Sequence, residues 1–233
     1  MGLNHTFGLL KTVRHGAETS RRAVYAKAVW WLAADVVILN VLTLAGCLPV
    51  VTAGASLTAC ARVAGEMVAD DDPAVMSTWW RSFRLNLRQS LAWWLPVLVL
   101  VALSAWEYLL LSDSSLGESD GGVSGSLSGL VLAGGVLLAA ILVWLLPLAA
   151  FFDAPVSRHL SNALRLAVGR LGVTVLALVI VAAPAIVFWG LAASRAPVTW
   201  FMVLIGPAFQ TYLIALLQRS TMVSLRGAST SES

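Results

Sequence analysis

Charged residues are scarce in this sequence of 233 residues. Only 12% are Asp, Glu, Lys or Arg, whereas 59% are hydrophobic; soluble domains carry about 25% and about 45–50%, respectively. The apolar surplus exceeds what one globular core can hide, so lipid must cover much of it. Cysteine and histidine are also rare: Cys47 and Cys60 fall in apolar stretches, and His5, His15 and His159 are scattered. This pattern supports neither a disulfide framework nor a zinc site, and we expect no cofactor, no metal and no enzyme activity.

Long apolar runs are abundant and predict an all-α, polytopic membrane protein. A spanning helix needs about 20 mostly apolar residues. Six segments qualify, at roughly 28–47, 49–69, 91–112, 127–150, 171–193 and 198–218. We therefore expect a six-helix membrane domain over residues 28–218, a basic N-terminal segment, residues 1–27, and a disordered Ser-rich tail, residues 219–233. The first run ends in Leu44-Ala45-Gly46-Cys47, which imitates a lipoprotein signal, but a further hydrophobic segment follows at once, and we favour a retained helix.

The positions of the basic residues indicate how the six segments thread through the membrane. If all six cross, every Lys and Arg lies on one side except Arg62, inside the second segment, and Arg195, on the other side. Lys and Arg accumulate on the cytoplasmic side, so we expect a multi-pass protein of the bacterial inner membrane with N-terminus and C-terminus in the cytoplasm. The loop 113–126 has acidic but no basic residues, as an outer loop should. Without the second crossing, the arginines at 81–88 would change sides and the bias would collapse.

Two segments, 77–90 and 156–170, are too polar to span but are patterned as helices. In the first we expect Trp80, Phe83 and Leu87 to form the apolar stripe. Arg81, Arg84 and Arg88 form the neighbouring stripe of the first segment, and Arg158 and Arg165 fall on the face of the second that is opposite its apolar residues. We expect two amphipathic helices along the cytoplasmic membrane surface, each running into the next span. The arginines either contact anionic headgroups, at about 1 kcal/mol per basic residue, or dock a protein partner.

Asp35 lies inside the first predicted span, where a central charge costs about 2.5–3.5 kcal/mol and calls for a partner or water. The first two spans join through a tight turn near Leu48, which predicts an antiparallel hairpin. Residues whose numbers add to about 97 then share a depth, and Asp35 and Arg62 satisfy this condition. We predict an Asp35–Arg62 ion pair in the bundle, with a structural role in hairpin register or, alternatively, a role in transport. Glu66, one helical turn after Arg62, competes for the same guanidinium.

Two motifs in the first half of the chain carry a family resemblance. The stretch Leu39-Asn40-Val41-Leu42 precedes Cys47-Leu48-Pro49-Val50-Val51-Thr52-Ala53-Gly54, and the basic motif Trp80-Arg81-Ser82-Phe83-Arg84-Leu85-Asn86-Leu87-Arg88-Gln89 follows. In order and spacing these motifs resemble the YesL-like family of bacterial membrane proteins. They cover roughly residues 39–95, and the acidic run Asp70-Asp71-Asp72-Pro73 departs from the family pattern. Members are associated with bacterial carbohydrate-uptake systems, so the resemblance implies an accessory role near sugar transport and supplies no catalytic residues.

The function we expect is a non-enzymatic membrane protein that assists the assembly or regulation of a carbohydrate importer. The expected partners are the lipid bilayer and importer subunits, with a homo-oligomer as a further option and no nucleic acid. The alternative is a small solute transporter or channel, with Asp35, Arg62 and Asn40 lining its path beside the central prolines Pro184 and Pro207. A membrane-embedded enzyme has least support, because no catalytic set converges at one depth.

Overall fold

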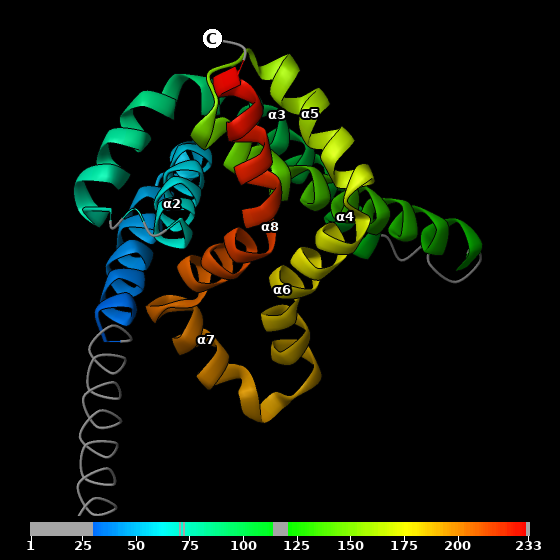
Figure 1. Ribbon diagram of the computed structural model, residues 1–233. Helices are drawn as coiled ribbons and strands as arrows, with labels where there is room; N and C mark the ends of the chain where they lie inside the picture. Colours follow the sequence, from blue (N-terminus) through cyan, green and yellow to red (C-terminus); the bar gives the residue numbers. More distant parts are fainter. Residues whose placement is uncertain (1–29, 70, 72, 114–120, 232–233) are drawn as a thin grey trace, which may run out of the picture.

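The computed structural model describes residues 30–69, 71, 73–113 and 121–231 (Figure 1). Within these ranges the chain is helical and contains no strand, which confirms the predicted all-α class. The basic N-terminal segment, residues 1–27, and residues 114–120 of the predicted outer loop 113–126 lie outside the described residues. Residues 121–126 of that loop belong instead to a helix that begins at Gly121.

Several helices are long and apolar enough to cross a membrane. Among the described residues there are four, or five if the bent pair α7 and α8 forms one span. The four are the N-terminal helix (Trp30–Cys47), Val75–Trp106 within α3 (Val75–Asp113), Gly129–Phe151 within α4 (Gly121–Phe151), and α6 (Leu171–Gly190). The bent pair consists of α7 (Arg195–Leu204), which follows the short η2 (Ala192–Ser194), and α8 (Gly206–Ser231). These helices indicate a multi-pass membrane protein.

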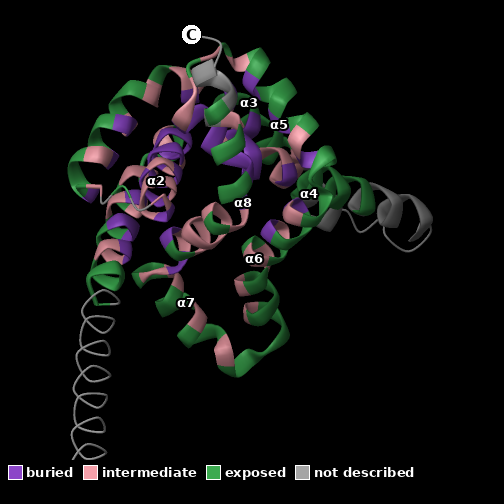
Figure 2. Ribbon diagram, viewed as in Figure 1, coloured by how far each residue is buried: buried purple, intermediate pink, exposed green. Residues whose placement is uncertain are grey.

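Helix α2 (Ala53–Val68), preceded by η1 (Val50–Thr52), occupies the centre of the bundle. Eleven of its 16 residues are buried, and it packs against α3, α4 and α8 (Figure 2). Small residues such as Ala55 and Ala59 face the neighbouring helices and allow their backbones to approach closely. At 1.5 Å per residue α2 is about 24 Å long, shorter than the hydrocarbon core of about 30 Å. It is therefore not among the candidate spans, although the sequence predicts a crossing here.

The N-terminal helix and α2 form the predicted antiparallel hairpin. The Ser56 hydroxyl donates a hydrogen bond to the Thr43 carbonyl at 2.7 Å, and Leu39 and Cys60 belong to one buried cluster. The numbers of Thr43 and Ser56 add to 99, two residues from the expected register. The Thr52 hydroxyl closes the turn, because it donates hydrogen bonds to the carbonyls of Gly46 and Pro49. The hairpin is confirmed, with a small shift in register.

Helix α3 contains the first amphipathic segment together with the span that the sequence predicts it to run into. Residues 77–90 and 91–112 lie in one continuous helix, and the apolar stripe predicted on Trp80 is not the buried face, because Trp80 is 48% exposed. The buried face consists of Val75, Trp79, Ser82, Ser90, Trp93 and Val97. Two of these buried residues are small serines, so the core-facing row is less hydrophobic than its neighbour.

Helix α5 (Val156–Gly169) is a separate short helix that buries His159, Ala163 and Ala167 and exposes Arg158 and Arg165. Its position on a membrane surface stays a prediction. Beyond it, α6 and α7 form a V at the bottom of Figure 1, and α8 returns upward. Helix α8 continues to Ser231, through residues that the sequence predicts to form a disordered tail.

Candidate functional site at the junction of α2, α4 and α8

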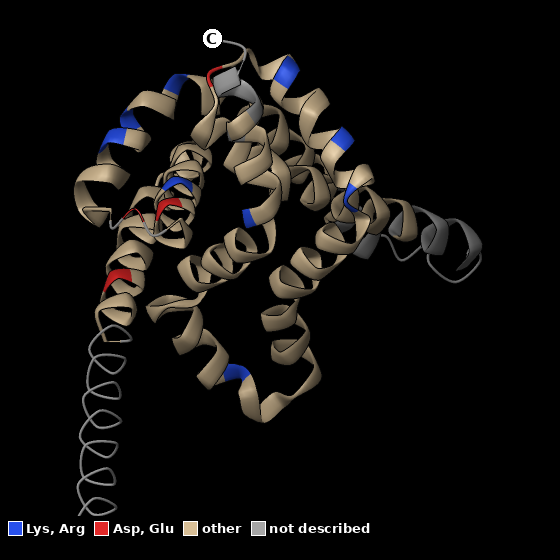
Figure 3. Ribbon diagram, viewed as in Figure 1, with Lys and Arg blue, Asp and Glu red and all other residues tan. Residues whose placement is uncertain are grey.

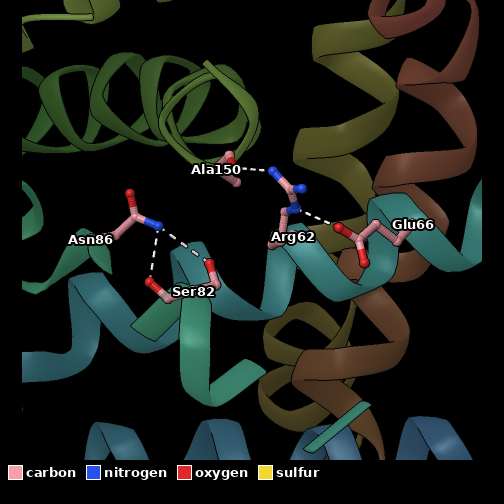
Figure 4. A network of polar contacts seen from close by, with 5 residues as sticks. All are labelled: Arg62, Glu66, Ser82, Asn86 and Ala150. Carbon is pink, nitrogen blue, oxygen red and sulfur yellow. Dashed lines mark hydrogen bonds and ion pairs between the residues drawn. The ribbon is translucent and has the colours of Figure 1, made fainter. Parts of the chain in front are cut away.

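Arg62 of α2 is the centre of a polar junction (Figure 4). Its Nε lies 2.5 Å from Oε1 of Glu66, one turn later on the same helix. One terminal nitrogen of the guanidinium donates to the carbonyl of Ala150 at 2.9 Å, and its carbon lies 4.6 Å above the Phe151 ring. A single side chain thus joins a carboxylate of α2 to the last turn of α4.

The chemistry of helix ends explains why an arginine is used here. The last four carbonyls of a helix have no partner inside the helix, and they carry the negative end of its dipole. Arg62 supplies a donor and a positive charge to Ala150 in that turn. From α3, the Gln89 side chain donates to the Ala154 carbonyl at 2.8 Å, in the linker that follows α4. Two neighbouring helices therefore hold the end of α4 in place.

The predicted partner of Arg62 was Asp35. Asp35 is half-buried on the N-terminal helix and has an interaction of its own. The ion pair that the structure gives Arg62 is with Glu66, the residue expected to compete for it. The Asp35–Arg62 pair stays a prediction.

A cavity of about 290 Å³ lies beside this junction, between helices of the bundle. Three helices line most of it: α2 from Leu57 toward its C-terminal end, α4 from Ala139 to Phe151, and α8 from Pro207 to Val223. The hydrogen bond from Arg62 to Ala150 joins the C-terminal halves of α2 and α4 at this cavity. The lining is almost wholly apolar and includes one charged residue, Arg219.

Three polar side chains along the cavity, those of Gln210, Thr211 and Gln218, already donate hydrogen bonds to helix backbones. The Gln210 amide donates to the Ile180 carbonyl of α6 at 2.6 Å, and the Gln218 amide donates to the Val143 carbonyl of α4 at 3.0 Å. The Thr211 hydroxyl donates within α8, at 2.8 Å. A ligand rich in hydroxyl groups would find few donors available in this cavity.

Asn40 of the N-terminal helix lies against the break between α7 and α8, where the two helices meet at 72°. Its amide donates to the Val203 carbonyl at 2.8 Å, and its carbonyl accepts from the backbone N–H of Ala208 at 3.0 Å. One side chain thus satisfies groups at the end of α7 and the start of α8. Beside it, a groove of about 430 Å³ is lined by both Pro184 and Pro207, so the structure brings together Asn40 and the two central prolines.

The five arginines singled out in the sequence lie on exposed faces of α3 and α5. Figure 3 shows these two arginine-bearing faces on opposite flanks of the upper part of the molecule. Arg84 stacks over the Trp80 ring at 4.8 Å. None of the five forms an ion pair with another residue that the structure describes. We call them the α3 arginine face (Arg81, Arg84, Arg88) and the α5 arginine face (Arg158, Arg165).

Sequence reasoning missed His159, which it treated as one of three scattered histidines. The side chain is 2% exposed, at the start of α5 and against the linker that follows α4. Burial lowers the pKa of His159, and the nearby Asp153 carboxylate only partly offsets this. Its Nε2 has no hydrogen-bond partner among the described residues. Its place in the apolar pattern of α5 was the available signal, since it precedes buried Ala163 by one turn.

The described part of the chain has few side chains that could bind a metal ion or take part in covalent chemistry. No group of three His, Cys, Asp or Glu side chains there could hold a metal ion. Cys47 and Cys60 are free thiols, one half-buried and one buried.

Comparison with known proteins gave one match. Comparisons with curated proteins and with solved structures found none. Residues 24–108 match the model of a family described as a protein of unknown function, DUF624. This stretch contains the hairpin, Arg62, Glu66 and the α3 arginine face. Over these residues the chain is similar to the DUF624 family.

Proposed function

We propose that this protein is a YesL-like, non-enzymatic membrane component that assists the assembly or regulation of a bacterial carbohydrate importer. The observation that carries the proposal is the α3 arginine face. Its three arginines lie within the family match, are exposed, and have no ion-pair partner among the described residues. Exposed arginines flanked by an aromatic ring are typical of surfaces that bind a partner.

An affinity purification from gently solubilised membranes tests this proposal. We expect importer membrane subunits to copurify with the tagged wild-type protein. The triple variant Arg81→Glu, Arg84→Glu, Arg88→Glu should lose them, because it reverses the charge of the surface. Arg195→Glu, far along the chain in α7, is the matched control and should retain them. Recovery of no importer subunit above background with the wild type would refute the proposal.

We further propose six crossings, with both termini in the cytoplasm and with α2 and the bent α7–α8 pair as the second and sixth. Two observations support this arrangement. The ends of α2 and α4 meet at Arg62 and Ala150, as expected if both helices run inward. The α3 and α5 arginine faces occur near one end of the molecule in Figure 3, whereas Arg195 lies in α7 at the other.

Cysteine labelling of intact cells tests the topology. In a background with Cys47 and Cys60 replaced by Ser, we expect a membrane-impermeant maleimide to label Arg195→Cys. It should label Arg84→Cys only after the cells are opened. Labelling of residue 84 from outside, with residue 195 protected, would overturn the proposed orientation.

A small solute transporter or channel is a second candidate, favoured by the break between α7 and α8. Discontinuous helices in transporters expose backbone groups near the substrate. Pro207 lines both the cavity and the groove, so the break lies between them. Against a sugar pathway, the cavity is apolar and Asn40 already satisfies groups at the break. Flux assays in proteoliposomes discriminate, because an accessory protein alone should move no solute.

A further inference from the structure

We propose that α5 lies in the boundary between the headgroups and the acyl chains of one leaflet, where Arg158 and Arg165 bind the phosphates of anionic phospholipids. The leaflet is the one in which α6 begins. This inference does not depend on the role in carbohydrate uptake, because it concerns a different surface from the α3 arginine face. It also does not depend on the number of crossings, because it needs only α4 and α6 as spans.

Helix α5 has a buried row of side chains and, next to it, an exposed apolar row. The buried row consists of His159, Ala163 and Ala167, and the exposed row consists of Leu160, Leu164 and Val168. Residues of the first row are at most 5% exposed, whereas those of the second are 45–62% exposed. Polar residues normally occupy the side of a helix that faces water. A second apolar row therefore calls for a second apolar environment, beyond the core of the bundle.

The position of α5 between two candidate spans indicates which environment this is. The span in α4 ends at Phe151, and the span in α6 begins at Leu171. Between them, the buried row of α5 belongs to the same core cluster as Leu145 and Leu148, in the last two turns of α4. Helix α5 therefore lies beside the end of a span, at the level where a membrane surface is expected, and not in a domain that projects away from it.

The exposed apolar row continues into the surface of α6. Only Arg170 lies between the two helices. Leu171 follows Val168 at helical spacing and is also exposed, and Val175 and Val179 follow on α6 at intervals of four. Because α6 is a candidate span, acyl chains cover its exposed apolar residues. The row on α5 is the continuation of that surface, so the same acyl chains reach it.

The two arginines lie on the far side of this row from the bundle. Both side chains are exposed, and neither forms an ion pair with another residue that the structure describes. In a helix at a membrane surface, the apolar row faces the acyl chains and the basic residues lie at the level of the headgroups. The planar guanidinium of arginine matches two oxygens of one phosphate. A single phospholipid can therefore satisfy both features of α5.

The helices packed against α5 supply no carboxylate that would compensate its arginines. These helices are α4, α6 and α3, and the first two contain no charged residue. The acidic residues of α3 lie in its last two turns, far from Gln89, which contacts the linker before α5. Glu66 is held by Arg62, and the Asp71 N–H donates to the Glu66 carbonyl. Both belong to the end of α2, which packs mainly against α3, α4 and α8.

The remaining carboxylate near α5 is that of Asp153, in the linker before the helix. It is exposed, and it interacts electrostatically with His159. Against this one negative charge, the segment carries the three arginines Arg158, Arg165 and Arg170. The balance is positive, and a positive segment at a membrane surface attracts anionic lipids in preference to zwitterionic ones.

Fluorescence quenching in vesicles tests the position of α5. The full-length protein, with Cys47 and Cys60 replaced by Ser, carries an NBD fluorophore on either Leu164→Cys or Asn162→Cys, which lie about 200° apart around the helix. It is reconstituted into vesicles of phosphatidylcholine and phosphatidylglycerol. We expect a nitroxide on the lipid acyl chain to quench position 164 more strongly than position 162. Aqueous iodide should show the reverse order.

A comparison of two labelled lipids tests the headgroup. At equal mole fraction, nitroxide-labelled phosphatidylglycerol should quench position 164 more strongly than nitroxide-labelled phosphatidylcholine. Arg158→Gln with Arg165→Gln should lower the relative association constant of phosphatidylglycerol, by about fivefold for each arginine. Arg81→Gln with Arg88→Gln removes the same charge from the opposite flank (Figure 3) and should leave it unchanged. Without either pair of substitutions, added salt should also weaken the preference, and this result does not depend on how a variant folds.

Three outcomes would overturn the proposal. Equal quenching of positions 162 and 164 by the acyl-chain nitroxide would show that α5 does not present its apolar row to lipid. Protection of position 164 from both quenchers would show that protein, such as a second copy of the chain, covers the row. Equal association of the two lipids, unchanged by salt and by the loss of Arg158 and Arg165, would refute the binding of anionic headgroups.

Discussion

Two thermodynamic cycles that share Arg62 can decide which carboxylate is its partner. The side chain of Arg62 is 37% exposed and that of Glu66 is 17% exposed, so solvent weakens their attraction. Arg62→Met removes the ion pair and the donor to the Ala150 carbonyl. Charge-assisted hydrogen bonds contribute about 1.5–3 kcal/mol when buried; discounted for exposure, we expect a total loss of about 2 kcal/mol. Glu66→Gln leaves the bond to Ala150 in place and should cost about 1 kcal/mol.

The double variant separates the contribution of the Arg62–Glu66 ion pair from that of the hydrogen bond to the Ala150 carbonyl. We expect Arg62→Met with Glu66→Gln to be less destabilised than the sum of the singles by about 1 kcal/mol, because it leaves no carboxylate without a partner. The assay is thermal unfolding in detergent micelles, where about 1 kcal/mol shifts Tm by roughly 2–4 °C in a chain of this size. The corresponding cycle with Asp35→Asn should show a coupling below about 0.5 kcal/mol. A larger coupling for Asp35 than for Glu66 would refute this assignment and restore the predicted Asp35–Arg62 pair.

Three further substitutions test the helix contacts. Asn40→Leu should destabilise the protein by about 2 kcal/mol, because it leaves the buried N–H of Ala208 and the part-buried carbonyl of Val203 without their partner at the α7–α8 break, and hydrogen exchange at Ala208 should become faster. Gly65→Leu should cost about 1–3 kcal/mol, because a Cβ there would lie 2.6 Å from the Phe151 ring; Phe151→Ala should recover part of the loss in Tm. The lowered pKa of His159 should make stability complete above pH 6.5 and progressively lost as the pH falls through the folded-state pKa, since protonation then favours the unfolded chain. His159→Phe should flatten Tm against pH over that range.

The hairpin could be predicted from the sequence because local signals specify it. Pro49 ends one apolar run and begins another, so two helices must meet at a tight turn. The predicted register differs by two residues from the observed pairing of Thr43 with Ser56. That difference is enough to change the level at which Asp35 lies relative to Arg62. Loop geometry sets such a register, and helical periodicity alone does not resolve it.

The continuity of α3 was predictable in principle. No Gly or Pro occurs between Val75 and Pro96, so nothing in the sequence stops a helix between residues 90 and 91. The change from polar to apolar composition near residue 90 indicates where this helix enters the predicted span, and the backbone continues through it. Conversely, the Gly206-Pro207 pair is a recognised break signal, and it coincides with the start of α8.

The partners of the polar residues could not be predicted, because they are distant in the sequence. Asn40 bonds to Val203, and Arg62 bonds to Ala150; no periodicity links such positions. Gln218 likewise reaches a carbonyl of α4. Each of these donors also has a backbone carbonyl as its partner. Because every residue has such a carbonyl, the amino-acid sequence does not indicate which one accepts the hydrogen bond.

The backbone partners of these polar side chains help to locate the surfaces that can bind another molecule. In a bilayer, a polar side chain that bonds to the backbone of another helix stabilises helix association. Asn40, Gln210 and Gln218 all do so here, and Arg62 does so while also holding Glu66. Side chains committed in this way are poorly placed to exchange partners with a passing solute, because each exchange would leave a carbonyl unsatisfied. Recognition is better served by surfaces whose groups have no such commitment, which is why we propose partner binding on the α3 arginine face.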